Sequence, residues 1–564
     1  MATTALEPVR RIVLATPATR GGLRNAGTDN PASRLSAARN LAIVANLVAA
    51  TPSTRQPSHE GATIISGRPP YRLVRSVVEK RVPSLDAPEL LDSAALRLGI
   101  AQRPRASFAR VRECGVGQGQ GRGGETRQWR SSHDREIVRL AVPAFGALIA
   151  EPLYLLADTA IVGHLGTREL GGIAIASIVL TAVFGIFNFL AYSTTGTVAR
   201  HLGAEKPRAA AEHGIDGIWL AAGLGIGLTM LGLAAVPVII DVMGASSAVR
   251  PFASDYLRIS LLGAPFVLVA LASAGYLRGV QDTKTTLFVA IGANVANLAL
   301  ELFFVYGLDA GIAGSAWGTV IAQVVSMFVF VTIVRRRTKV TGARLTPRTK
   351  GMRSAAFVGS QLMVRTGSLL AALLVTTALA ARISNVALAA HQIAFQVWMF
   401  LALALDAIAI AGQALVGRYL GAGDATSARS VSRRMLHLGL ASGTVLGLAV
   451  IATRPWLSDL FTDAADVRRQ TDQILWFVAG LQPLAAAVFI FDGILIGAGD
   501  AKYLAGAMAA ASAIYGGVLL LMTTLDLNLE LLWSAFTVWM IVRWLGLVRR
   551  FRTERWAVTG AERS

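Results

Sequence analysis

The chain has 564 residues, of which 54% are apolar and 16% are charged, and its mean hydropathy is +0.53. A soluble domain carries roughly 45–50% apolar and about 25% charged residues, so this composition excludes a disordered protein and disfavours a soluble multidomain enzyme. The formal net charge of +20 leaves two explanations open, contact with nucleic acid or the basic loops of a membrane protein, and the single cysteine, Cys114, excludes an intrachain disulfide.

Residues 1–134 are predicted to be a basic, disordered N-terminal extension. Their basic residues outnumber the acidic ones by about two to one, and they contain no apolar run long enough to cross a bilayer. The stretch GVGQGQGRGG at 115–124 is of low complexity and cannot bury a core. The extension is either a tail that touches anionic lipid or sequence upstream of the true start of the protein, and the sequence leaves this open.

Twelve apolar stretches of about 20 residues follow, each long enough to cross about 30 Å of hydrocarbon as a helix. They predict an all-α polytopic membrane protein with an N-lobe at 135–340, a basic inter-lobe loop at 341–353, a C-lobe at 354–550 and a tail at 551–564. The predicted spans are 137–163, 171–197, 214–240, 254–277, 285–306, 311–334, 354–381, 385–416, 434–453, 471–496, 502–524 and 531–548.

The charges of the connecting loops predict the orientation in the membrane. The sixth connection, 335–353, carries eight Lys or Arg, and the C-terminal segment 549–555 adds four Arg. The even-numbered connections are richer in basic residues than the odd ones, which places them and both termini in the cytoplasm. The predicted location is the plasma membrane, and the net charge is explained without nucleic acid as a partner.

The two halves of the sequence repeat each other. When the chain is shifted by 218 residues, Arg200-His-Leu-Gly-Ala falls on Arg418-Tyr-Leu-Gly-Ala, and Asp282 and Lys284 fall on Asp500 and Lys502. Six spans in each half give parallel repeats, related by an axis along the membrane normal. Many secondary transporters are built in this way, with the substrate path between the two halves.

The N-lobe contains two carboxylates at the depth of the membrane, Asp158 in the first span and Glu301 in the fifth. An ionised group in hydrocarbon is costly, so each is a candidate functional residue. Tyr154 and Asp158 are four residues apart, as are Asn297 and Glu301, so each pair shares one helix face. The residues allow either a proton on the carboxylates or a sodium ion among the oxygens, and they also allow a purely structural role. In the first span, Pro143 is a candidate hinge.

The C-lobe carries its own pair, Asp406 in the eighth span and Asp492 in the tenth, with Gln392 as a further candidate. Arg365 and Arg543 are possible permanent partners of these acids, and a structural role is as open here as a functional one. The repeat places no acid opposite any of the four carboxylates, which favours a separate specialisation of each lobe.

No catalytic or cofactor signature occurs. The sequence contains neither GxxxxGK[ST] nor HExxH, so no enzyme activity, cofactor or resident metal is expected. Trp533 and Trp556, near span ends, are predicted to lie in an interfacial aromatic belt.

Four strings resemble the multidrug and toxic compound extrusion (MATE) family, and within it the branch of the DNA-damage-inducible protein F (DinF). They are LYLLADTAIVGHLG at 153–166, LRGVQDTK at 277–284, GIAGSAWGT at 311–319, and the long segment from AAHQIAFQ to RYLGAGD at 389–424. Together with the order of the spans, they extend the resemblance over residues 135–556.

The resemblance implies a two-lobed antiporter, driven by an inward proton gradient or, as the second choice, a sodium gradient, that expels organic cations or other amphipathic compounds. It links Asp158 to cation coupling. The cluster that it implies in the N-lobe is Tyr154, Asp158, Asn297, Glu301 and Thr319. The four residues other than Tyr154 are the implied ligands of a sodium ion. The position of Glu301 is more often Asp in this family. Asp492 resembles an acid of another bacterial branch, but Arg365 replaces the glutamate that accompanies it there.

Two alternatives stay open. The first is a flippase for a lipid-linked precursor, which a broad basic groove between the lobes would favour. The second is a membrane-bound enzyme or sensor that does not transport. A monomer is expected, with the lipid bilayer and a small-molecule substrate as the partners.

Overall fold

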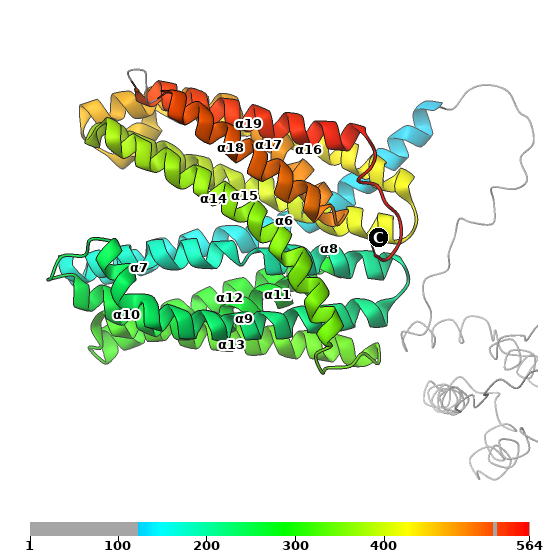
Figure 1. The fold of residues 1–564 in the computed structure, drawn as a ribbon, viewed down its shortest axis with the longest axis horizontal. Coiled ribbons are helices and arrows are strands. Elements are labelled where there is room, and N and C mark those ends of the chain that lie inside the picture. The colour runs from blue at the N-terminus through cyan, green and yellow to red at the C-terminus, as the bar shows by residue number, and fades with distance from the viewer. Residues whose placement is uncertain (1–121, 523–526, 563–564) are drawn as a thin grey trace, which may run out of the picture. The chain divides into compact units, whose positions relative to one another are not determined.

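The structure is a computed structural model that describes residues 122–522 and 527–562 (Figure 1). In this part of the chain every regular element is a helix. The predictions for residues 1–121 lie outside the described residues. The first helix begins at Arg122, so its first turns fall within the segment that the sequence analysis treats as an extension.

The N-lobe consists of eight helices and one π-helical turn. These are α6 (Arg122–Gly163), α7 (Thr167–Ile186), α8 (Phe189–Gly203), α9 (Pro207–Val242), α10 (Arg250–Leu262), α11 (Ala264–Gly279), α12 (Thr283–Leu302), η1 (Phe303–Gly307) and α13 (Gly311–Val340). The C-lobe consists of α14 (Thr349–Ile383), α15 (Asn385–Gly421), α16 (Ala425–Phe461), α17 (Ala465–Gly497), α18 (Ala501–Met522) and α19 (Leu529–Arg552).

These helices confirm the twelve predicted spans, with one correction. Eleven stretches are long and apolar enough to cross a membrane, and α7 and α8 together form one of them. The fourth span, predicted as a single helix at 254–277, is a pair, α10 and α11, bent by 48°. The bend lies at Gly263, two residues before Pro265, which has no N–H to donate to the preceding turn.

The ends of the helices confirm the internal repeat. Helix α8 ends at Gly203 and α15 at Gly421, which are 218 residues apart. The turns that follow also match in conformation. Glu205 has a φ of 58° where Gly423 has 81°, and Gln281 has 64° where Gly499 has 69°. Two side chains of the N-lobe therefore occupy left-handed turn positions that the C-lobe fills with glycine.

The first helix of each lobe packs against both lobes. Helix α6 contacts α12 of its own lobe and α15 of the C-lobe, and α14 contacts α18 of its own lobe and α9 of the N-lobe. Figure 1 shows α14 passing from one group of helices to the other. Helices α6 and α14 therefore help to connect the lobes, and α8 of the N-lobe also packs extensively on α15.

The predicted aromatic belt is wrong for both tryptophans. Trp533 is 2% and Trp556 1% exposed. The Trp533 ring packs on Phe536, which in turn meets Trp398 of α15 edge to face at 5.5 Å between the ring centroids. Their position near a span end is correct, but Trp533 lies on the face of α19 that packs inside the lobe. Trp556 follows α19 in the tail, where its ring stacks on Phe551 at 5.2 Å between the centroids.

Candidate functional site

Asp158 is held inside the N-lobe by hydroxyl groups. Its side chain lies near the end of α6 and is 1% exposed. The hydroxyl of Ser315, in α13, donates a hydrogen bond of 2.8 Å to Asp158 Oδ1, and the Tyr256 hydroxyl lies 3.5 Å from Oδ2. Two neutral donors stabilise the carboxylate without neutralising it, which leaves it able to accept a proton or another cation.

Glu301 is the second acid of this cluster. It is completely buried in the last turn of α12, and neither Oε atom has a hydrogen-bond partner among the described residues. The nearby Asn297 Oδ1 is also buried without a partner there. A π-helical turn follows at Phe303, a feature that is frequent at functional sites.

Contacts between three helices bring the predicted cluster together. The Tyr154 hydroxyl of α6 and Thr319 Oγ1 of α13 are 3.0 Å apart. Asp158 and Glu301 are close enough to interact electrostatically, and Tyr154 interacts with both. Helix α13 can come this close because Gly318 lies against α12, where a Cβ would stand 3.0 Å from the Glu301 nitrogen.

The structure adds two residues that the sequence analysis missed. Ser315 lies one helical turn before Thr319 in the string GIAGSAWGT, so the spacing of four could have identified it. Tyr256 lies on α10. Its contact with Asp158 depends on how α10 is rotated after the bend at Gly263, and no pattern in the sequence reports that rotation.

No cation is paired with Asp158 or Glu301 in the described part of the chain, because none of the ion pairs found there involves either residue. Two carboxyl groups surrounded by hydroxyl and amide oxygens make a hard-oxygen site, which suits a proton or a sodium ion. The site fits a coupling cation because both carboxylate oxygens of Glu301 are buried without a hydrogen-bond partner among the described residues.

The C-lobe acids are placed differently. Asp492 is 4% exposed and accepts hydrogen bonds from Arg365 and, at 3.3 Å, from Arg543. The Arg543 guanidinium also lies over the Trp539 ring, 4.9 Å from its centroid. Both arginines named in the sequence analysis thus pair with the same carboxylate.

Asp406 belongs to the same group of charges, at the boundary between the lobes. It interacts with Arg365 and with Arg278 of the N-lobe helix α11. Three guanidinium groups therefore surround two carboxylates, a surplus of one positive charge.

The remaining candidates lie away from these two clusters. Gln392 is exposed on α15, and the 14 residues between it and Asp406 correspond to about 21 Å of helix. Its neighbour His391 is buried and lies 3.2 Å from Thr377 Oγ1. Pro143 lies inside α6, which continues through it as a helix.

At the end of the spans that the loop charges assign to the cytoplasm, ion pairs join the lobes. Arg348, which immediately precedes α14, binds Asp216 of α9 through its main-chain nitrogen and side chain at 2.7–3.0 Å. Arg434 of α16 binds Asp134 of α6 at 2.7 Å. Asp216 and Arg434 occupy equivalent positions of the repeat. Asp216 of the N-lobe binds Arg348 at the start of α14, and Arg434 of the C-lobe binds Asp134 of α6. The two ion pairs therefore have the same arrangement with the signs of the charges reversed.

Next to these pairs the two chains cross at glycines. A Cβ on Gly203 would stand 2.0 Å from the Arg418 carbonyl oxygen, and one on Gly421 would stand 2.0 Å from that of Arg200. The Arg200 side chain reaches across the lobes to the carbonyl oxygens of Ala498, Val558 and Gly560 at 2.8–2.9 Å. The lobes are therefore in direct backbone contact here.

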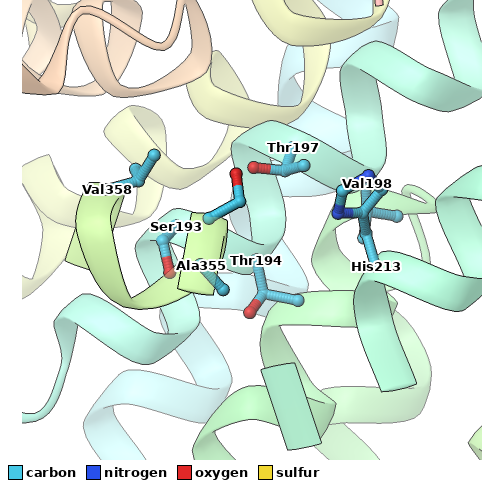
Figure 2. Close-up of a pocket in the computed structure, with 8 residues that line it drawn as sticks. Ser193, Thr194, Thr197, Val198, His213, Ala355 and Val358 are labelled. Atoms are coloured by element: carbon cyan, nitrogen blue, oxygen red, sulfur yellow. The ribbon is translucent and has the colours of Figure 1, made fainter. Parts of the chain in front are cut away.

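A small polar cavity of about 30 Å³ lies beside this contact, between α8, α9 and α14. Figure 2 shows the residues that line it: Ser193, Thr194 and Thr197 of α8, His213 of α9, and Ala355 and Val358 of α14. This volume holds a water molecule and excludes a drug-sized compound. It forms part of the closed end of the molecule.

Comparisons with known proteins agree with this architecture. A family model described as MatE matches residues 143–303 and 368–521, once in each half. Protein DETOXIFICATION 44, chloroplastic, of Arabidopsis thaliana is 32% identical over 426 residues, covering 72% of this chain and 80% of its own length. DNA damage-inducible protein F of Escherichia coli (strain K12) is 29% identical over 435 residues, covering 76% and 94%. A solved structure of a MOP superfamily transporter from Pyrococcus furiosus has a TM-score of 0.69 at 19% identity, covering 79% of this chain and 100% of its own.

Proposed function

Because the chain belongs to the MatE family, we propose that it is a cation-coupled antiporter that exports amphipathic compounds, organic cations among them. The observation that supports coupling most directly is the pair Asp158 and Glu301, buried together without a cationic partner in the described residues. The coupling ion is a proton, with sodium as the second choice. The proposed location is the plasma membrane, with both termini in the cytoplasm.

In the proposed cycle, the cation binds when the acid pair is open to the outside. Neutralising two adjacent carboxyl groups removes their mutual repulsion and their attraction for a positively charged compound. The cation then favours the conformation in which α6 has moved, with Pro143 as the point of bending. A ligand shifts this equilibrium only by its difference in affinity for the two states, so the acid pair has to differ between them.

The interlobe contacts supply the other half of the cycle. The pairs Arg348–Asp216 and Arg434–Asp134, together with the glycine crossing at Gly203, close the cytoplasmic end. Loading of substrate from the cytoplasm requires these contacts to separate. The side chains of Arg348, Arg434 and Asp134 are 29–35% exposed, although Asp216 is buried. Water can therefore reach one partner of each ion pair when the contact opens.

One observation favours the second candidate, a flippase for a lipid-linked precursor. The charges around Asp406 and Asp492 between the lobes have a positive surplus, which would attract a phosphate. The surplus is one charge and the side chains are enclosed, whereas a flippase requires a wide basic groove. Transport of a small amphipathic compound therefore remains the main proposal.

Proteoliposomes that contain the purified protein and ethidium test both candidates. An antiporter exports the dye when an inward proton gradient is imposed, and an inward sodium gradient alone drives it weakly or not at all. Absence of dye movement under either gradient would contradict the proposal. Under those conditions, movement of a fluorescent lipid between leaflets, measured by its accessibility to dithionite, would establish the flippase instead.

A further inference from the structure

A groove on the outer side of the C-lobe is distinct from both acid clusters. It has a volume of about 490 Å³, within the usual range for small-molecule sites. Helices α16 and α19 form its walls, α17 forms its floor through Ala487 and Phe491, and Glu554 and Trp556 of the tail close one end. We name it the α16–α19 groove.

The groove is basic at one end and apolar at the other. On α16 the lining residues Arg429, Arg433, Leu436 and Leu440 follow one helix face at spacings of four, three and four. On α19, Arg552 lies at the same end as Arg429, and Trp544 lies at the deeper end. Helix α16 begins, and α19 ends, at the membrane face that the loop charges assign to the cytoplasm, so both walls run from charge to hydrocarbon in the same direction.

The length of this gradient matches one leaflet of a bilayer. From Arg429 to Leu440 the chain advances eleven residues, or about 16 Å of helix. The hydrocarbon core is about 30 Å thick, so this distance spans one half of it. A molecule that fills the groove has its charged group at the membrane surface and its apolar part within a single leaflet.

The charges of the groove select a negative group. Three arginines line it against one acid, Glu554, which pairs with Arg429 at 3.0 Å. Arg433 and Arg552 are exposed and form no ion pair within the described residues. The Arg429 Nε is buried without a hydrogen-bond partner there. Guanidinium groups match phosphate oxygens in geometry and charge, and basic pockets at this membrane face bind anionic headgroups.

We propose that the α16–α19 groove binds one anionic glycerophospholipid of the cytoplasmic leaflet, with its phosphate between Arg433 and Arg552 and an acyl chain along Leu440 and Trp544. Free phosphate lacks the apolar part that the floor and deeper walls accommodate. A zwitterionic lipid brings its own cation, which the surplus of arginine repels. The proposal does not depend on the transport function, since binding is measured without substrate or ion gradient.

The test counts lipids bound to the purified full-length protein by native mass spectrometry during titration with phosphatidylglycerol or phosphatidylcholine. The double variant Arg433→Gln/Arg552→Gln is compared with Arg335→Gln/Arg336→Gln. The control removes the same charge, at the same membrane face, from exposed positions of α13. We expect one tight phosphatidylglycerol on the wild type and on the control, and an affinity about tenfold lower on the groove variant.

Three results would overturn the proposal. Equal affinity for phosphatidylcholine would mean that the arginines do not select charge. Equal losses in the groove and control variants would mean that the lipid responds only to overall charge. Displacement of the lipid by glycerophosphoglycerol as effectively as by dioleoyl phosphatidylglycerol would mean that the site recognises a soluble phosphate. All four substituted side chains are exposed, and unchanged thermal unfolding in lipid-free detergent verifies that the variants fold.

Discussion

The two lobes share one fold but treat their buried acids in opposite ways. In the N-lobe, Asp158 and Glu301 are surrounded by hydroxyl and amide groups, and no cationic side chain of the described residues pairs with them. In the C-lobe, Asp492 is held between Arg365 and Arg543. An acid that already has two permanent partners contributes to structure, whereas an acid without one is available to a mobile ion. The duplication therefore preserved the helices while the charges diverged.

The difference between the two lobes is tested most severely by neutralising one acid in each of them. Asp158→Asn should reduce gradient-driven ethidium efflux from proteoliposomes to the level of protein-free vesicles, because the site can no longer exchange a cation. The variant should fold, since Ser315 Oγ can still donate to the amide oxygen. Efflux at the wild-type rate would contradict the assignment.

The reverse outcome is expected in the C-lobe. Asp492→Asn removes the carboxylate that Arg365 and Arg543 share and leaves Asp406 as the remaining acid of this group. Removal of one partner from a buried pair costs about 3–5 kcal/mol. Thermal unfolding in detergent should therefore occur at a clearly lower temperature than for Asp158→Asn. The variant Asp492→Asn/Arg365→Met, which also removes one of the stranded charges, should recover part of the loss. Equal stability of the two single variants would remove the distinction between the lobes.

A smaller effect is expected from the ion pairs that join the lobes at the end proposed to face the cytoplasm. Asp216→Asn weakens the hold of α9 on Arg348 by about 1.5–3 kcal/mol. The population with the lobes separated at this end should increase about tenfold or more. Distances between spin labels at Arg208 and Thr426, in a background with Cys114→Ser, report the separation.

The matched control for this measurement is Asp241→Asn. This residue pairs with Arg250 within the N-lobe, so its removal should leave the label distances unchanged. Equal effects of the two variants would show that the Arg348 pair does not govern the separation of the lobes.

The smallest expected effect concerns the turn in which the N-lobe has a side chain where the C-lobe has glycine. Glu205 has a φ of 58°, so Glu205→Gly should relieve strain and stabilise the protein by about 0.5–1 kcal/mol. The adjacent Lys206→Gly, at a φ of −111°, should destabilise it slightly. A difference of the opposite sign in thermal unfolding would contradict the interpretation of this turn.

Local patterns were sufficient to predict much of this structure. Apolar runs predicted the spans, and spacing of four placed Tyr154 beside Asp158. The 218-residue repeat aligned the segments 200–204 and 418–422, in which the structure ends α8 and α15. These features depend on residues that are near one another in the chain, or on comparison of the sequence with itself.

Contacts between distant helices were not predictable in the same way. The sequence offered Arg365 and Arg543 as partners for two different acids, and the structure places both on Asp492. The burial of Trp533, the contact of Tyr256 with Asp158 and the crossed pair Arg348–Asp216 all depend on helix rotation. Rotation is set by the packing of whole lobes, and the hydropathy of a uniformly apolar span carries little information about it.

The central claim is that Asp158 and Glu301 hold the ion that is exchanged for substrate. Its most direct test measures the protons, or in sodium buffer the sodium ions, released when ethidium is added to purified protein in weakly buffered detergent solution. The wild type should release cations in proportion to the dye bound. Asp158→Asn/Glu301→Gln lacks the carboxylates that attract the dye, so it should bind ethidium more weakly and release no cation for the dye that it binds. Equal release by both proteins would contradict the account.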